Sequence, residues 1–212
     1  MISISGIKYQ KELETLPYFN KKQAGMLIGK KGKNLDKKLE QLVKIGYLLN
    51  FKKGAYTTIT FYEKSNKTEF AEYIANTLRL PSYISLEYVL SKENLIPEAV
   101  YSITSITIKT SRTFNNFLGS FLYKNIKKDL FLGYQEKRRE DKKIYQATKS
   151  KALFDFLYLK KLVNVKQELT NDLRINWDNF TKTDLLEFKK YVKISSSKKM
   201  ENILEVINSY VN

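Results

Sequence analysis

The sequence predicts an α+β protein in which a small N-terminal domain, residues 1–62, precedes a larger domain, residues 63–212. Apolar residues recur at helical spacing in two short segments that are separated by a turn. Two short β-type runs then flank Lys52-Lys53-Gly54. Beyond residue 63, β-branched runs are followed from Lys149 onward by amphipathic helical patterns.

The first domain begins with two predicted helices. Asn20 is a favourable N-cap for a helix over residues 21–28, which stops at Gly29. Residues 29–32 form a turn, and a second helix starts at Asn34 and runs to about Ile45. Gly46 would end this helix.

The second predicted helix separates its apolar residues from its basic ones. At about 100° per residue, one side carries Leu35, Leu39, Leu42 and Val43. The opposite side carries Lys33, Asn34, Lys37, Lys38, Gln41 and Lys44, and Asp36 and Glu40 fall at the border. A solvated helix usually mixes both signs of charge, so this face is typical of a DNA recognition helix.

A hairpin with Lys52-Lys53-Gly54 at its tip follows that helix. The order helix, turn, helix, strand, turn and strand is that of a winged helix-turn-helix. The hairpin lysines would contact phosphates, and the amides of Asn34 and Gln41 could read adenine. The alternative is that the lysines only protect an edge strand from aggregation. The predicted DNA-binding residues are Lys30, Lys31, Lys33, Asn34, Lys37, Lys38, Gln41, Lys44, Lys52 and Lys53.

Charge supports a polyanionic partner. The net charge of the 212 residues is +16, and residues 1–60 carry 12 basic and 4 acidic side chains. Double-stranded DNA is the first candidate partner and an anionic membrane surface the second, whereas a lysine-rich solubilising surface is the plainer explanation. The sequence lacks cysteine, histidine, a signal peptide and an apolar run of membrane-spanning length, so we expect a cytoplasmic protein without disulfides, imidazole chemistry or a membrane partner.

The larger domain is predicted to combine a small antiparallel sheet, up to about residue 147, with a helical C-terminal tail. Helices are expected over residues 69–80, 82–92, 149–161, 166–174, 181–193 and 197–210. Strands are expected over residues 101–108, with a bulge at Ser105, and over 117–123, 130–134 and 144–147. Thr181 and Asp184 have the spacing of a capping box.

Catalysis is not expected. Glu136, Glu140 and Asp141 could in principle hold the metal of a nuclease, but a mixed-charge run is more often a solvated loop. Lys151 and Asp155 have the spacing of an intrahelical ion pair or could make an interdomain contact. Arg112, Lys137, Arg138 and Arg139 form a candidate second basic patch. We expect no metal and no cofactor.

Four segments behind the predicted winged helix carry a family resemblance: "LPSYISLEYVLSKENLIPEAVYSITSITIKTSRTF", "GSFLYKNI", "LFLGY" and "KALFDFLYL". Together they resemble the antitoxin and transcriptional-regulator family of AbiE-type, type IV toxin-antitoxin systems, which act in abortive infection of phage-infected cells. The resemblance spans roughly residues 15–160. The chain departs from it at Lys149-Ser150, where members usually have Pro-Glu.

The resemblance implies a repressor of its own operon that also counters a nucleotidyltransferase-like toxin, without a stable complex with it. We expect a monomer that binds its operator cooperatively, with Lys151 and Asp155 as the first candidates for the antitoxin function. An operon regulator without a toxin is the nearer alternative, and an RNA-binding or nuclease protein the more distant one.

Overall fold

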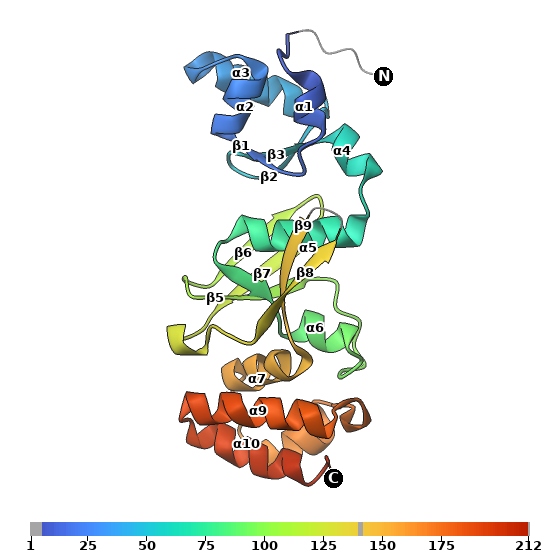
Figure 1. Ribbon diagram of the computed structural model, residues 1–212, viewed down its shortest axis with the longest axis vertical. Helices are drawn as coiled ribbons and strands as arrows, with labels where there is room; N and C mark the ends of the chain where they lie inside the picture. The colour runs from blue at the N-terminus through green and yellow to red at the C-terminus, as the bar shows by residue number, and fades with distance from the viewer. Residues whose placement is uncertain (1–5, 140–141, 212) are drawn as a thin grey trace. The chain divides into compact units, whose positions relative to one another are not determined.

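The computed structural model describes residues 6–139, without the side chain of Arg139, and residues 142–211 (Figure 1). The protein is α+β, as predicted, and divides into two compact units. The first unit comprises Met1–Ile74 and Phe114–Gly119, and the second comprises Ala75–Thr113 and Ser120–Asn212. The division falls inside one helix and inside one hairpin.

The first unit surrounds a three-stranded antiparallel sheet of order β1-β3-β2. Its elements are α1 (Gln10–Glu14), β1 (Phe19–Asn20), α2 (Lys21–Ile28), α3 (Gly32–Lys44), β2 (Leu48–Lys52), β3 (Ala55–Thr58), α4 (Ile59–Lys64) and most of α5 (Lys67–Leu78). Its core includes Leu13, Phe19, Ala24, Ile28, Leu35, Leu39, Leu42, Tyr47 and Leu48.

Local signals define the ends of α2 and α3. The side chain of Asn20 accepts a hydrogen bond from the Gln23 N–H, which confirms the predicted N-cap. After α3, the N–H of Gly46 donates to Val43 O and the N–H of Tyr47 donates to Leu42 O. This pair of bonds is a Schellman motif, which confirms that the helix stops here.

The second unit combines helices with most of a six-stranded sheet, whose strand β6 continues into the first unit. Its further elements are β4 (Ser82–Ile84), α6 (Glu87–Lys92), β5 (Ile103–Thr107), β6 (Arg112–Asn116), β7 (Gly119–Asn125), a 3₁₀ turn (Lys128–Leu130), β8 (Tyr134–Arg139), β9 (Lys142–Ala147), α7 (Lys149–Leu159), α8 (Val165–Gln167), a π-helical turn (Glu168–Asp172), a second 3₁₀ turn (Trp177–Asn179), α9 (Lys182–Ser195) and α10 (Lys198–Asn208). The helices α7, α9 and α10 pack on one another as a separate layer (Figure 1).

The sheet of the second unit is mixed, which corrects the predicted antiparallel sheet. Its order is β6-β7-β5-β4-β9-β8. The strands β5 and β7 run parallel, as do β4 and β9, whereas β4–β5 and β8–β9 are antiparallel. Parallel neighbours that are distant in sequence cannot be recognised from hairpin-like spacing alone.

Three local predictions in this unit are wrong. Residues 82–84 form a strand, and the helix begins only at Glu87. Ser105 is not bulged, because every residue of β5 is buried and the register with β7 is continuous from Ile103 to Thr107. Residues 130–133 are a 3₁₀ end and irregular chain, and Tyr134 instead starts β8.

Other boundaries move by smaller amounts. The helix α3 starts at Gly32, two residues before the predicted start. Phe117 lies in the turn between β6 and β7, and the expected helix over residues 166–174 is divided into α8 and a π-helical turn. The capping box of Thr181 and Asp184 is confirmed.

The side chain of Asn76 joins the two halves of the larger sheet. Strands β4 and β9 pair in register only at Ile84 and Gln146. Asn76 is 4% exposed, and its Nδ2 donates to Ser82 O at 3.4 Å and to Tyr145 O at 3.2 Å. Its Oδ1 accepts the Tyr145 N–H at 2.6 Å. One amide therefore supplies hydrogen bonds that the short ladder lacks.

Replacing Asn76 should destabilise the protein strongly. Asn76→Ala leaves the partly buried Tyr145 N–H and two carbonyls without this partner, so we expect the free energy of unfolding to fall by about 2–4 kcal/mol. Urea denaturation measures the change. Asn171→Ala, at an exposed position of the same unit, is the control and should shift stability by less than about 0.5 kcal/mol. Equal effects of the two substitutions would contradict the role of the amide.

Candidate nucleic-acid interface

The outer face of α3 is basic and accessible. Lys33, Asn34, Lys37, Gln41 and Lys44 are exposed. The opposite face is buried through Leu35, Leu39 and Leu42, with Val43 partly buried. The helical period predicted this division because each apolar residue of α3 has to reach the same core.

A close approach of α2 to α3 fixes that face. Gly25 lies in α2, and a β-carbon there would be 3.1 Å from Leu35 Cδ2 and 3.1 Å from Lys30 O. A side chain at this position would require Leu35 and the Lys30 carbonyl to shift by a few tenths of an ångström. Lys21 at the start of α2 also forms an ion pair with Asp36 of α3.

A hydrogen bond connects the tip of the β2–β3 hairpin to the start of α2. The N–H of Lys21 donates to Gly54 O at 3.1 Å. In β2 the register shifts between Asn50 and Lys52, and Phe51 is buried between them against Phe70 and Phe117. This bulge anchors the hairpin in the core of the first unit and leaves Lys53 exposed.

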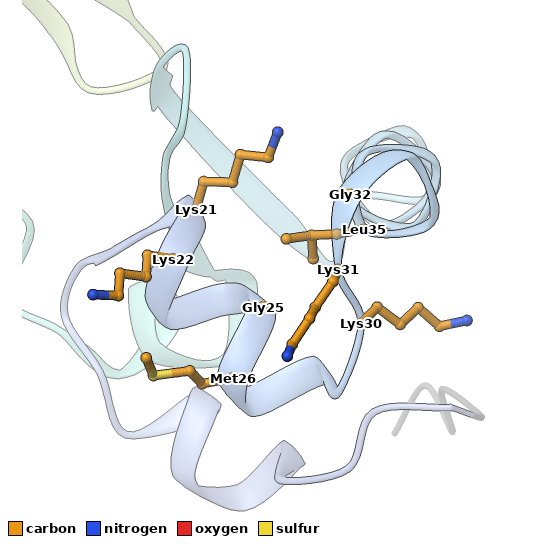
Figure 2. A pocket seen from close by; sticks show the side chains of 8 residues that line it. All are labelled: Lys21, Lys22, Gly25, Met26, Lys30, Lys31, Gly32 and Leu35. Carbon is orange, nitrogen blue, oxygen red and sulfur yellow. The ribbon is translucent and has the colours of Figure 1, made fainter.

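A hollow of about 580 Å³ lies between α2 and the start of α3. Figure 2 shows four lysines around it, Lys21 and Lys22 from α2 and Lys30 and Lys31 from the turn. Met26 and Leu35 form its apolar part. Sequence reasoning missed Lys21 and Lys22, although their place at the start of a helix before a basic turn could have suggested them.

The structure brings most of the predicted DNA-binding residues together in the first unit, with two qualifications. Lys38 is half-buried and lies 3.5 Å from the Gln41 side-chain oxygen. Lys52 is half-buried with its Nζ 5.5 Å from the centre of the Phe114 ring, so Lys53 is the more available charge of the hairpin tip.

The proposed second basic patch is not one surface. Arg112 lies in β6 and Lys137–Arg139 lie in β8, which are the two opposite edge strands of the sheet. Arg138 and Lys143 are also paired with Glu136, and these hydrogen bonds lower the pKa of the Glu136 carboxyl. The prediction grouped these residues because all of them are basic, but the strand order places Arg112 and Lys137–Arg139 on opposite edge strands of the sheet.

Lys151 and Asp155 are inaccessible. Both side chains are 0% exposed and form an ion pair within α7. Ser85 Oγ and Tyr83 Oη donate to Asp155 at 2.8 and 3.0 Å. Burial raises the pKa of Asp155 and lowers that of Lys151, and each charge partly offsets the shift of the other.

The Lys151 side chain also fills a confined space. Its Nζ lies 5.0–5.7 Å from the ring centres of Tyr83, Phe154 and Tyr191. A β-carbon at Gly133 would be 2.9 Å from Lys151 Cδ. This packing leaves no surface through which the pair could contact a partner in the described structure.

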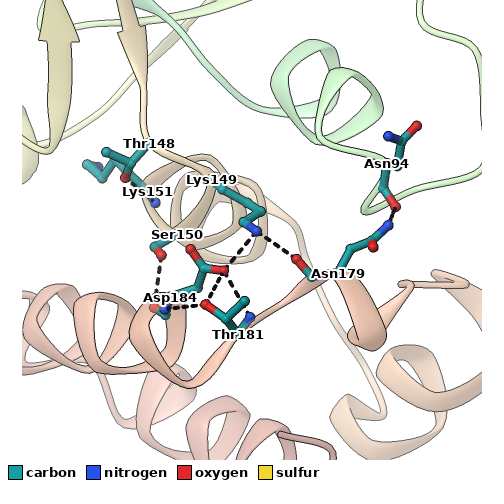
Figure 3. A network of polar contacts seen from close by, with 8 residues as sticks. All are labelled: Asn94, Thr148, Lys149, Ser150, Lys151, Asn179, Thr181 and Asp184. Carbon is teal, nitrogen blue, oxygen red and sulfur yellow. Dashed lines mark hydrogen bonds and ion pairs between the residues drawn. The ribbon is translucent and has the colours of Figure 1, made fainter.

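The residues that depart from the family resemblance bind α7 to α9 (Figure 3). Lys149 Nζ is 2.8 Å from Asp184 Oδ2 and donates to Asn179 O, while Ser150 Oγ donates to Asp184 O. Burial alone would raise the pKa of Asp184, but the hydrogen bonds from Lys149 and Thr181 outweigh it and lower that pKa. Lys149 and Ser150 therefore hold the start of α7 against α9.

Residues 6–139 and 142–211 contain neither a candidate metal site nor a helix that could span a membrane. This part of the chain contains no group of three or more acidic side chains placed to hold a metal ion. Glu140 and Asp141, two of the candidate carboxylates, lie outside the described residues. None of the helices in the same part has the length and apolar character to cross a bilayer.

Breaking the buried pair should cost far more stability than breaking an exposed one. Asp155→Ala leaves a buried ammonium without its carboxylate, so the free energy of unfolding should fall by about 3–5 kcal/mol. Lys151→Met with Asp155→Asn removes both charges but keeps an acceptor for Tyr83 and Ser85, so its loss should be smaller than the sum of the single losses.

Chemical denaturation of these variants provides the measurement. Glu98→Ala, which removes an exposed ion pair with Arg174, is the control and should change stability by about 0–1 kcal/mol. If Asp155→Ala is no more destabilising than Glu98→Ala, the pair does not hold this unit together.

No protein-family model matches this chain, and no curated protein sequence resembles it significantly, so its function must follow from the residues and the geometry described above.

Proposed function

We propose that this protein is a DNA-binding transcriptional regulator whose first unit acts as a winged helix-turn-helix. The observation that carries the proposal is the outer face of α3, where exposed lysines are interspersed with the amides of Asn34 and Gln41. The acidic residues of the helix, Asp36 and Glu40, lie at the border of this face, and Asp36 is paired with Lys21.

The dimensions of α3 suit the major groove. Its 13 residues extend for about 20 Å at 1.5 Å per residue, and a groove about 12 Å wide admits one helix. Lys33, Lys37 and Lys44 would contact phosphates along the groove. The amides of Asn34 and Gln41 offer a donor and an acceptor each, as adenine requires.

The hairpin β2–β3 would serve as the wing. Lys53 is exposed at its tip, and the tip is bonded to α2 through Lys21 and Gly54. Because Lys21 also pairs with α3, the wing and the recognition helix are supported by the same residue. This shared support favours DNA contact over a hairpin whose lysines only prevent aggregation.

Base-reading and phosphate-binding residues should behave differently on substitution. Asn34→Ala and Gln41→Ala should each reduce discrimination at one base position by about 1–3 kcal/mol, with little effect on a random duplex. Lys53→Ala should weaken binding to both duplexes and make the slope of log affinity against log salt shallower by about 1.

Titrations of the DNA upstream of the gene and of a random duplex, over a range of salt concentrations, measure both effects. Equal losses on the two duplexes for Asn34→Ala and Gln41→Ala would remove them as base readers. An unchanged salt slope for Lys53→Ala would remove the wing from the interface.

The proposal extends to an antitoxin role, which is supported by the resemblance of the second unit's segments to AbiE-type antitoxins. In this role the protein would repress its own operon and counter a nucleotidyltransferase-like toxin without a stable complex. The nearer alternative is a regulator without a toxin, and the neighbouring coding sequence distinguishes the two.

Repression and rescue from a toxin should depend on different residues. A full-length variant with Lys33, Lys37, Lys38 and Lys44 changed to alanine, called here the α3 variant, should lose repression because phosphate contacts are lost. It should still rescue growth when co-expressed with the toxin, since the second unit is unchanged. Loss of rescue at matched protein levels would place the antitoxin function in the first unit.

A further inference from the structure

We propose that one end of the larger sheet is a second nucleic-acid contact surface, which binds the phosphate backbone of duplex DNA without reading its sequence. The strands β5 and β7 are parallel neighbours, so their carboxyl-terminal residues, Thr107 and Asn125, lie side by side at the same end of the sheet. The start of β4 joins them because Ser82 pairs with Thr107.

Basic residues from three chain segments converge at this sheet end. We call them the sheet-end cluster: Arg79, Lys109, Arg112, Lys124, Lys127 and Lys128. Five of them are exposed and Arg79 is partly buried. Within the turns that carry them, residues 107–112 and 124–129, the single acidic side chain is Asp129. Basic side chains therefore outnumber acidic ones in these two turns.

Hydrogen bonds fix these turns to one another. Arg79 donates to the backbone oxygen and the hydroxyl of Thr110. Asn125 donates through its N–H to Ser111 Oγ at 3.0 Å and through Nδ2 to Lys109 O at 3.0 Å. The cluster thus presents its charge from a rigid backbone, which lowers the entropy lost when a polyanion binds.

The chemistry favours a phosphate backbone over base recognition. The lysines are point charges, and the Asn125 side chain, the amide of these turns, already bonds to Lys109. The exposed apolar residues nearby in sequence are Leu80 and Ile108, without an aromatic anchor of the kind found at membrane interfaces. The choice of DNA rather than another polyanion rests on the proposed function.

The test uses full-length protein and a DNA duplex of random sequence. The cluster variant changes Lys109, Lys124, Lys127 and Lys128 to alanine. Its slope of log affinity against log salt should be shallower by about 2–4, since each lost phosphate contact contributes about 0.9. The control variant changes Lys182, Lys190, Lys193 and Lys198, which are exposed lysines of α9 and α10, and alters net charge equally. Its slope should stay within about 1 of the original.

Two further arms separate the possible outcomes. The α3 variant should retain residual duplex binding. This residual binding should disappear when the substitutions of the α3 variant and of the cluster variant are combined in one chain. Vesicles of phosphatidylcholine and phosphatidylserine test the membrane alternative, and loss of vesicle binding with unchanged DNA binding would overturn the proposal. The pairs Lys109→Ala with Lys124→Ala and Lys127→Ala with Lys128→Ala provide milder variants, and each should give about half the effect.

The two proposals fail in distinguishable ways. If the cluster variant matches the control while the α3 variant loses binding, this inference is wrong and the proposed function stands. If only the cluster variant loses binding, the second unit is the DNA-binding part and the role proposed for α3 is wrong.

Discussion

A buried charge pair organises the second unit. Lys151 and Asp155 are both fully buried, and a charge in that position is tolerated only when its partner and hydrogen bonds are present. Burial, followed by the nearby Asp155 carboxylate, raises the pKa of Tyr83, so its hydroxyl stays protonated and donates to that carboxylate. The pair thereby links α7 to residues in and after β4, and the helix in turn holds α9 through Lys149 and Ser150.

The first unit distributes its charges in the opposite way. Its core is apolar, and its lysines lie on the outside of α2, α3 and the hairpin. Lys21 connects all three elements, because its side chain pairs with Asp36 while its N–H bonds to Gly54. Substituting residues on this surface should therefore affect the proposed DNA binding more than folding, whereas substituting Lys151 or Asp155 should affect folding first.

The parts of the fold that depend on local signals could be predicted from the sequence. The Asn20 cap, the period of α3 and the turn at Gly54 depend on a few neighbouring residues, and each is found as expected. Long-range pairing cannot be predicted from local patterns, so the sequence predicts a helix at residues 82–84, whereas the structure pairs them with β5 and β9. The exposed α3 residues followed from helical period, but the sheet-end cluster assembles residues from Arg79 to Lys128 and required the strand order.

The amide of Asn76 also constrains the order in which the larger sheet can form. Its partner Tyr145 lies 69 positions further along the chain, and closing so long a loop loses entropy before the contact is rewarded. Strands β4, β5 and β7 are complete by Asn125. The edge of β4 stays unpaired until residues 142–147, which form β9, have been synthesised. During synthesis this half-sheet therefore exposes the unpaired edge of β4, through which nascent chains can pair with one another before β9 is made.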